Sequence, residues 1–404
     1  MAEALPSCPF CRCAEEELSN AMNFNHPRQN NSTTTTRLLC AIVFCLFSFL
    51  WLYFFQSDTI AYGQHVFSKG RTVYSPLTGA LLITVSLQVL QLVVYGFIRL
   101  ERRWHALTYL PSFLLLAIIS DIDEKTTGHL SLGHWCWVLP LLLVLWGVAV
   151  WLSYGFQLAE GSRQNRCQTA WVSLLTMGLL IVLTAAFANT NAVFHYRAHI
   201  EHCLQTGRVD EALATGRRSL ETDESLTMLR ASALARKGLM GERLFEYAVK
   251  GKSVDLLPLE GRSRCLMLPA DSIYKYLGAR PLQGMSTSHY YRTLLASRQA
   301  RPVLGDYVLC GLLLEKQIDQ FVRQLPDYYP VNDSLPKHYR EALVLYAHLR
   351  SEPLLVYRHT VTEEDYSDLR KLESKHPSYS DRKEQVREKF GQTYWYYYKY
   401  EGNK

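Results

Sequence analysis

Long apolar runs in the first half of the chain constrain its fold more than any other feature. A helix that crosses a bilayer needs about 20 predominantly apolar residues. Five segments approach that length: Leu38–Phe55, Leu77–Ile98, Trp104–Ser120, Trp135–Leu158 and Ala170–Ala188. The third is short and carries Pro111 near its start. The sequence therefore predicts a polytopic transmembrane bundle of five helices over residues 37–188, within an all-α fold.

The distribution of basic residues predicts the orientation, because Lys and Arg are retained on the cytoplasmic side of short loops. With the N-terminus inside, eight basic residues are cytoplasmic: Arg12, Arg28, Arg37, Arg99, Arg102, Arg103, Arg163 and Arg166. Only Lys69, Arg71 and Lys125 fall outside. Five spans then place residues 189–404 on the extracytoplasmic side. If the third segment does not cross, four spans place them in the cytoplasm; the charge bias favours five.

Residues 189–404 have an ordinary soluble composition and mostly helical patterns. "TGRVDEAL" and "KGLMGERL" align with a spacing of 31 residues, which pairs Gly207 with Gly238. Each glycine suits the position just after a helix, where a positive φ costs glycine little. This pattern resembles the tetratricopeptide (TPR) helix–turn–helix, although its period is usually about 34 residues. The prediction is a TPR-like helical-hairpin solenoid; the alternative is an irregular helical domain with two similar turns.

Later segments continue the helical pattern. Residues 306–325 predict two helices around Lys316–Gln317, Leu335–Leu349 predicts one that begins near Pro336, and Asp381–Phe390 predicts a charged helix. The aromatic tail "TYWYYYKY" is interpreted as either a terminal strand or a surface cap.

The order of the spans, "TGRVDEAL", "RPVLGDYVLCGLLLEKQIDQF" and "LPKHYREALVLY" together resemble a family of uncharacterised bacterial multi-pass membrane proteins. Members carry a TPR-like extracytoplasmic region, and the resemblance covers roughly residues 30 to 400. It implies a bacterial inner membrane protein with a periplasmic C-terminal domain. The family has no established activity, so the resemblance supports the architecture and leaves the function open.

Residues 1–36 predict a cytoplasmic tail that contains "CPFCRC". Cys8, Cys11 and Cys13 include the Cys-x-x-Cys step of metal sites, with His26 as the nearby fourth ligand. Two other interpretations are a disordered tail and a translation start at Met22. The disordered tail is favoured, so no metal or cofactor is assigned.

Acidic residues follow the first and third spans on the predicted outer side. They are Asp58, Asp121, Asp123 and Glu124. Multi-span lipid-linked glycosyltransferases place acidic residues similarly, where they bind a divalent metal and act as a base. In that alternative Asp58, Asp121 and Asp123 are catalytic and converge on one cavity. The favoured interpretation is that these loop carboxylates are solvated.

Two further polar groups have helical spacing. Gln88 and Gln91, in the second span, are expected to bond another helix. His195, His199 and His202 have metal-compatible spacing, but Arg197 and Glu201 intervene, which favours a solvated face.

The net charge, the content of the spans and the lack of known motifs argue against several function classes. The net charge of +6 includes no block of Lys and Arg, which argues against nucleic-acid binding. The spans carry no charged residue at depth, which argues against a proton-coupled transporter. No phosphate loop, nucleophile elbow or kinase motif is found. The sequence thus predicts a membrane protein that presents a helical domain to a protein or peptide partner, without an assignable reaction.

Overall fold

The computed structural model describes residues 31–100, 102–124, 133–159 and 166–401. Within these ranges the chain forms helices and no strands, so the predicted all-α class is confirmed. The described residues divide into two compact units. Unit 1 comprises residues 31–55, 76–120 and 133–188, and unit 2 comprises residues 56–75, 121–124 and 189–401.

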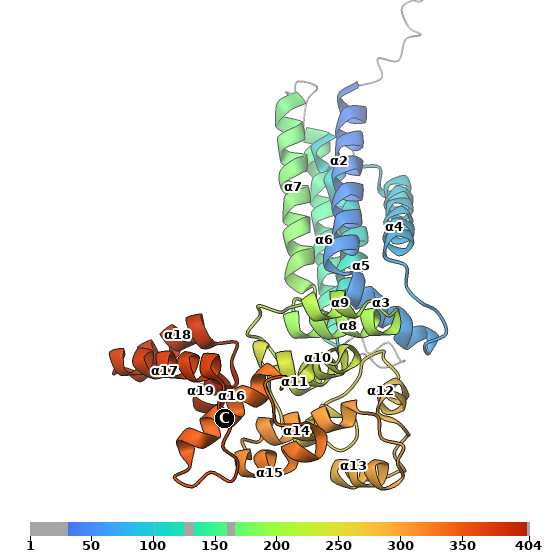
Figure 1. The fold of residues 1–404 in the computed structure, drawn as a ribbon. Coiled ribbons are helices and arrows are strands. Elements are labelled where there is room, and N and C mark those ends of the chain that lie inside the picture. The colour runs from blue at the N-terminus through green and yellow to red at the C-terminus, as the bar shows by residue number, and fades with distance from the viewer. Residues whose placement is uncertain (1–30, 101, 125–132, 160–165, 402–404) are drawn as a thin grey trace, which may run out of the picture. The chain divides into compact units, whose positions relative to one another are not determined.

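Unit 1 is a bundle of long apolar helices (Figure 1). Its α-helices are α2 (Asn31–Leu50), α4 (Pro76–Ile98), α5 (Leu110–Ser120), α6 (Trp135–Ala159) and α7 (Arg166–Phe187), and α2 continues into a π-helix, Trp51–Phe55. Four stretches of the described chain are long and apolar enough to cross a membrane: Thr34–Phe55, Pro76–Ile98, Trp135–Phe156 and Ala170–Phe187. They coincide with the first, second, fourth and fifth predicted spans and indicate membrane association.

The third predicted span differs from the other four. Arg102–Tyr109 forms a 3-10 helix, and α5 adds only 11 α-helical residues. Within the described residues, four helices rather than the predicted five are therefore long and apolar enough to cross a membrane. Pro111 lies in the first turn of α5 and has no N–H to donate back to the carbonyl of Leu107. The indole Nε1 of Trp146 donates to that carbonyl instead, at 2.9 Å.

This third segment is the best buried part of unit 1. Phe44 of α2 packs on the rings of Tyr109 and Phe113, with centroids 5.1 and 5.0 Å apart. Gln91 Nε2 donates to Thr108 Oγ1 at 2.9 Å, and Cys45 Sγ donates to Gln88 Oε1 at 3.6 Å. Both glutamines therefore bond another helix, as predicted.

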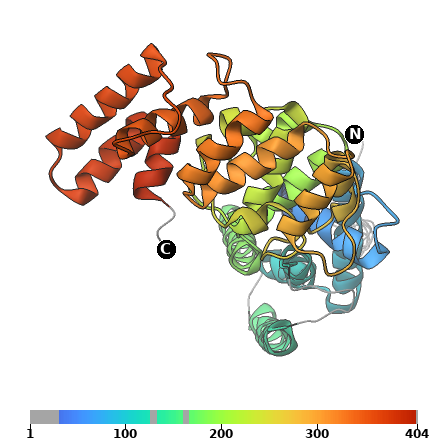
Figure 2. The ribbon, with the colours of Figure 1, turned by 60° about the horizontal axis from the view of Figure 1, so that its bottom comes forward.

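Unit 2 contains α3 (Ser57–Ser68) and the helices of the second half of the chain. These are α8 (Ala192–Gln205), α9 (Val209–Ala214), α10 (Glu224–Lys237), α11 (Met240–Arg243), α12 (Ala270–Leu277), α13 (Thr287–Ala296), α14 (Val303–Leu314), α15 (Ile318–Tyr328), α16 (Lys337–Leu349), α17 (Thr360–Lys375), α18 (Tyr379–Phe390) and α19 (Tyr394–Tyr400). Towards the C-terminus, α17 and α18 pack side by side, and α19 packs against α16 and α18 (Figure 2).

Three of the helical hairpins in unit 2 close on a residue with positive φ. The turns lie at Gly207 (φ 77°), Gly238 (φ 67°) and Lys316 (φ 58°). After each, the next amide donates back to a carbonyl five residues earlier; the Arg208 N–H, for example, donates to Cys203 O at 2.9 Å. This bonding satisfies carbonyls that a helix end otherwise leaves free. The predicted turns at both glycines and the break near Lys316–Gln317 are confirmed.

The aromatic tail is helix α19 and lies in the core, so both interpretations from the sequence, a strand and a surface cap, are wrong. Tyr394 and Tyr397 donate hydroxyl hydrogen bonds to the carbonyls of Leu313 and Leu314, at 3.2 and 2.8 Å. Both carbonyls lie in the last turn of α14, where a helix leaves carbonyls without a donor four residues later, and that of Leu313 also accepts the Lys316 N–H at 3.1 Å. The aromatic residues therefore fill the core and also cap a neighbouring helix.

Candidate functional site

Helix α8 organises the polar centre of unit 2. Asn191 begins the helix: its Oδ1 accepts the N–H groups of Val193 and Phe194, at 3.0 and 3.3 Å. Gly207 ends it. Between them the helix carries Arg197 and Glu201 one turn apart, and both are buried. Charged side chains are almost never fully buried unless they are paired.

Arg197 binds three separate segments of unit 2. Its Nη1 and Nη2 donate to the two carboxylate oxygens of Glu124, at 2.7 and 3.1 Å. The same guanidinium donates to Asp223 Oδ2 at 3.2 Å and to the carbonyl of Arg264 at 3.1 Å. A planar guanidinium is suited to such two-pronged contacts. Arg197 therefore ties residues 121–124 and the segment around residue 264 to the start of α10.

Glu201 binds a run of backbone amides. Its carboxylate accepts the N–H groups of Leu266, Met267 and Leu268, with Leu268 at 2.7 Å. Burial raises the pKa of Glu201, while the three amide donors and Arg197 oppose that rise. Together Arg197 and Glu201 attach residues 264–268 to α8.

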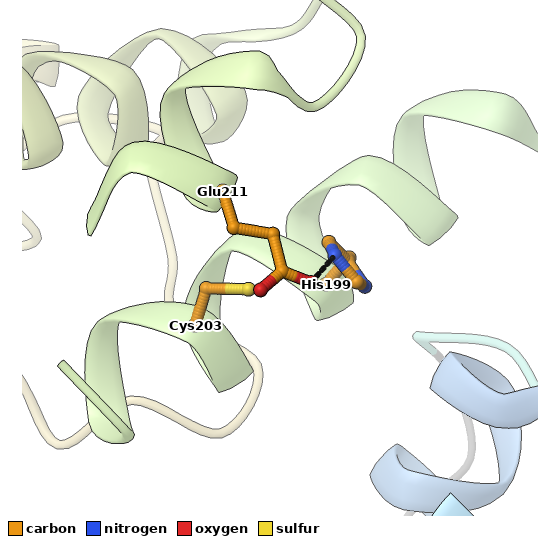
Figure 3. A group of neighbouring side chains, drawn as sticks. All are labelled: His199, Cys203 and Glu211. Carbon is orange, nitrogen blue, oxygen red and sulfur yellow. Dashed lines mark ion pairs between the residues drawn. The ribbon is translucent and has the colours of Figure 1, made fainter. Parts of the chain in front are cut away.

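A third cluster lies on the half-buried side of α8. His199 Nδ1 lies 3.1 Å from Asp58 Oδ1, and His199 Nε2 lies 3.4 Å from Glu211 Oε1. Cys203 follows His199 by one helical turn and is buried. One potential ligand atom each from His199, Cys203 and Glu211 lies within 4.8 Å of the others (Figure 3). The hydrogen bond to Asp58 is the main cause that raises the pKa of His199 to about 10.

A cleft of about 770 Å³ opens elsewhere in unit 2, around the turn after α9. It is lined by Tyr196, Asp210, Leu213, Ala214, Gly216, Arg217, Arg218, Ser219 and Arg243. Arg217 and Arg243 both contact Glu246 Oε2, at 3.0 and 3.1 Å, and Asp210 pairs with Lys237 at 2.9 Å. Arg218 is exposed. The cleft therefore has an excess of positive charge.

The three acids that the glycosyltransferase alternative requires, Asp58, Asp121 and Asp123, were compared with the two candidate sites of unit 2. Asp58 contacts His199, but none of the three acids belongs to the cluster of His199, Cys203 and Glu211, and none lines the cleft. Their convergence on a common cavity stays a prediction. Cys8, Cys11 and Cys13 lie outside the described residues.

The histidines behave differently from one another. His195 Nε2 lies 3.0 Å from the carbonyl of Asn189, and only His199 joins the cluster. Arg197 and Glu201, whose presence between the histidines favoured a solvated face for the histidine cluster, are buried pairing groups. Cys203 and Glu211 were not predicted from the sequence as partners of His199. Their signal is the four-residue step from His199 to Cys203, followed by a hairpin turn.

Comparison with known proteins shows similarity to one family over part of the chain and gives no activity. Residues 279–401 match the profile of a family of unknown function (DUF6057). The match covers 123 of the 404 residues, includes α13 to α19, and contains two of the stretches on which the sequence resemblance rests. Similarity to an uncharacterised family is therefore confirmed over this part of the chain. No curated protein and no solved structure matches the chain significantly.

Proposed function

We propose that this chain is a multi-pass membrane protein whose second half forms a TPR-like helical domain that binds a partner protein segment on the extracytoplasmic side. The cleft around the turn after α9 carries this proposal. Its volume suits a few side chains of a bound segment, and its lining combines Tyr196 and Leu213 with arginines. Ligand sites commonly join apolar walls to a few placed polar groups.

The TPR-like arrangement is supported by the hairpins. Helices α8, α9, α10 and α11 pack in succession as neighbouring hairpins, and Gly207 and Gly238 close them with the same bonding. Stacked hairpins of this kind bury a continuous core and leave surfaces on which segments of other proteins dock. Residues 244–302 interrupt the repeat before α14 and α15 form a further hairpin.

The charge of the cleft favours one class of partner. Three arginines and one aspartate line it, and that aspartate is itself paired with Lys237. Arginine is suited to binding carboxylates in two-pronged geometry. The proposed occupant is therefore a protein segment that carries acidic side chains or a C-terminal carboxylate.

Two observations favour five membrane crossings. Residues 102–120 form a continuous helical segment. With a rise of about 2.0 Å per residue in the 3-10 helix and about 1.5 Å per residue in α5, this segment is about 32 Å long. A hydrocarbon core is about 30 Å thick. The segments that follow α2, α5 and α7 also belong to one compact unit, unit 2. With the charge bias, this supports a cytoplasmic N-terminus and an extracytoplasmic unit 2.

Reporter fusions test the topology. A reporter that is active only outside the cytoplasm should be active after Lys404 and silent at Arg102. The reverse pattern would contradict the proposal and favour four crossings or inverted insertion.

Partner binding is tested by cross-linking in intact membranes, with wild type, Arg218→Glu and Arg292→Glu compared side by side. Arg292 is an exposed arginine outside the cleft, so it is the matched control. A partner bound by its carboxylates should be lost from Arg218→Glu and retained by Arg292→Glu. Binding of purified chain to arrays of acidic, neutral and basic peptides should show the same order. Equal capture by all three proteins, or no preference for acidic peptides, would contradict the cleft as the binding site.

A further inference from the structure

The hairpin of α8 and α9 brings a nitrogen, a sulfur and an oxygen ligand together. His199 and Cys203 are four residues apart, so they lie on one face of α8. The positive φ of Gly207 reverses the chain, and α9 then places Glu211 against that face. We propose that His199, Cys203 and Glu211 form a binding site for a divalent transition metal of the zinc class.

The separations of these atoms are close to those that a tetrahedral metal requires. Metal–ligand bonds of about 2.0–2.3 Å place neighbouring ligands about 3.3–3.7 Å apart. His199 Nε2 and Glu211 Oε1 lie 3.4 Å apart, and all three ligand atoms lie within 4.8 Å of one another. The separation of His199 Nε2 and Glu211 Oε1 already matches, and the separations to Cys203 Sγ must shorten by at most about 1.5 Å to close the site.

The neighbours of the cluster orient it. Asp58 Oδ1 holds His199 Nδ1 at 3.1 Å, so that Nε2 faces Glu211. A carboxylate that binds the second nitrogen of a ligating histidine is the usual support of zinc sites. Arg208 Nη1 holds Glu211 Oε2 at 2.8 Å, which leaves Oε1 for the metal. Asp58 is therefore a positioning residue.

The ligand set favours zinc over calcium or magnesium, because those ions prefer all-oxygen ligands whereas zinc accepts thiolate and imidazole. Three protein ligands leave one tetrahedral position for water or an incoming group. Side chains of His199 and Glu211 are 31% and 45% exposed, so the metal can enter from solvent. Metal binding replaces protons on His199 and Cys203.

The first experiment measures metal on the full chain in detergent. The protein is stripped with chelator, reloaded with zinc or cobalt, and assayed by elemental analysis and absorption. The cobalt form should hold one metal with a thiolate-to-cobalt charge-transfer band and tetrahedral visible bands. The measurement is repeated with Cys8, Cys11 and Cys13 changed to serine, because those thiols could also bind metal. Loss of all bound metal in that background would overturn the proposal.

Variants then identify the ligands. His199→Gln, Cys203→Ser and Glu211→Gln should each abolish the stoichiometric metal or the charge-transfer band. Asp58→Asn should weaken affinity about 10–100-fold by chelator competition while the band remains. Cys265→Ser and His202→Gln are controls, since neither residue belongs to the cluster.

Circular dichroism of each variant separates a lost ligand from a lost fold. Glu211→Gln is the decisive variant, because its half-exposed side chain can change without disturbing the core. Full metal content and an unchanged spectrum in folded Glu211→Gln and His199→Gln would show that the cluster is only an ion-pair network.

Discussion

Replacement of Glu201 tests whether buried polar contacts fix residues 264–268 onto α8. Of the three amides that this carboxylate accepts, those of Met267 and Leu268 are buried. A buried amide left without an acceptor costs about 1–3 kcal/mol, so Glu201→Ala should destabilise unit 2 by about 2–6 kcal/mol. Domains are typically stable by only about 5–15 kcal/mol.

Glu201→Gln is the sharper variant, because the side chain keeps its size and loses its charge. One amide oxygen can still accept part of the network, and the carboxylate's desolvation cost disappears. The expected loss is therefore about 1–2 kcal/mol. Because about 1.4 kcal/mol corresponds to tenfold in an equilibrium constant, local opening should increase about 5- to 30-fold.

Hydrogen–deuterium exchange of the purified chain in detergent measures that opening. Peptides that cover residues 264–268 should exchange faster in Glu201→Gln than in wild type. Glu388→Gln, an exposed glutamate on α18, is the control and should exchange as wild type does. Unchanged protection of Leu266–Leu268 in Glu201→Gln would refute the role assigned to this carboxylate.

Three further predictions concern other parts of unit 2. Gly207→Val should lower the stability of unit 2 by about 1–2 kcal/mol, because valine is strained at positive φ. An added Cβ would meet no atom within 4 Å, so no steric clash adds to this cost. The variant should be cut faster by protease between residues 192 and 252, and unchanged cleavage there would contradict the prediction. Burial raises the pKa of Asp306 above its usual value near 3.8, so its contribution to stability should be present below about pH 4 and lost as the pH rises through the raised pKa. In denaturant titrations Asp306→Asn should therefore lose stability less steeply with rising pH than wild type does. The same pH dependence in both proteins would exclude the mechanism. Glu341 Oε2 accepts the Tyr394 N–H and lies 2.9 Å from His338 Nδ1. Glu341→Ala should therefore lower the stability of unit 2 by about 2–5 kcal/mol and expose residues 391–401 to protease. Continued protection of those residues would count against this prediction.

The local features of this fold were predictable from the sequence. The apolar runs identify four helices that are long and apolar enough to cross a membrane, because a bilayer imposes a minimum length and excludes unpaired backbone groups. Gly207 and Gly238 mark the hairpin turns because a positive φ is a property of the residue and its immediate neighbours. The all-helical class follows from the same local periodicity.

The aromatic tail illustrates what local pattern leaves open. Tyrosine and tryptophan favour strands in isolation, yet "YWYYYKY" forms α19. Its hydroxyl groups bond the carbonyls of Leu313 and Leu314 at the end of α14, about 80 residues earlier in the chain. Such a partner is invisible in a window of the sequence, so tertiary contacts decided this element.

The candidate site was decided in the same way. Arg197, His199 and Glu201 lie two residues apart in the sequence, and nothing in this spacing indicates that Arg197 and Glu201 are buried. Only the fold places Glu124 and the amides of residues 266–268 against α8, where they pair with the buried Arg197 and Glu201. The hairpin likewise brings Glu211 to His199 and Cys203. Helical propensity is a short-range property, whereas pairing of buried charges depends on segments far apart in the chain, and therefore only the tertiary structure determined the site.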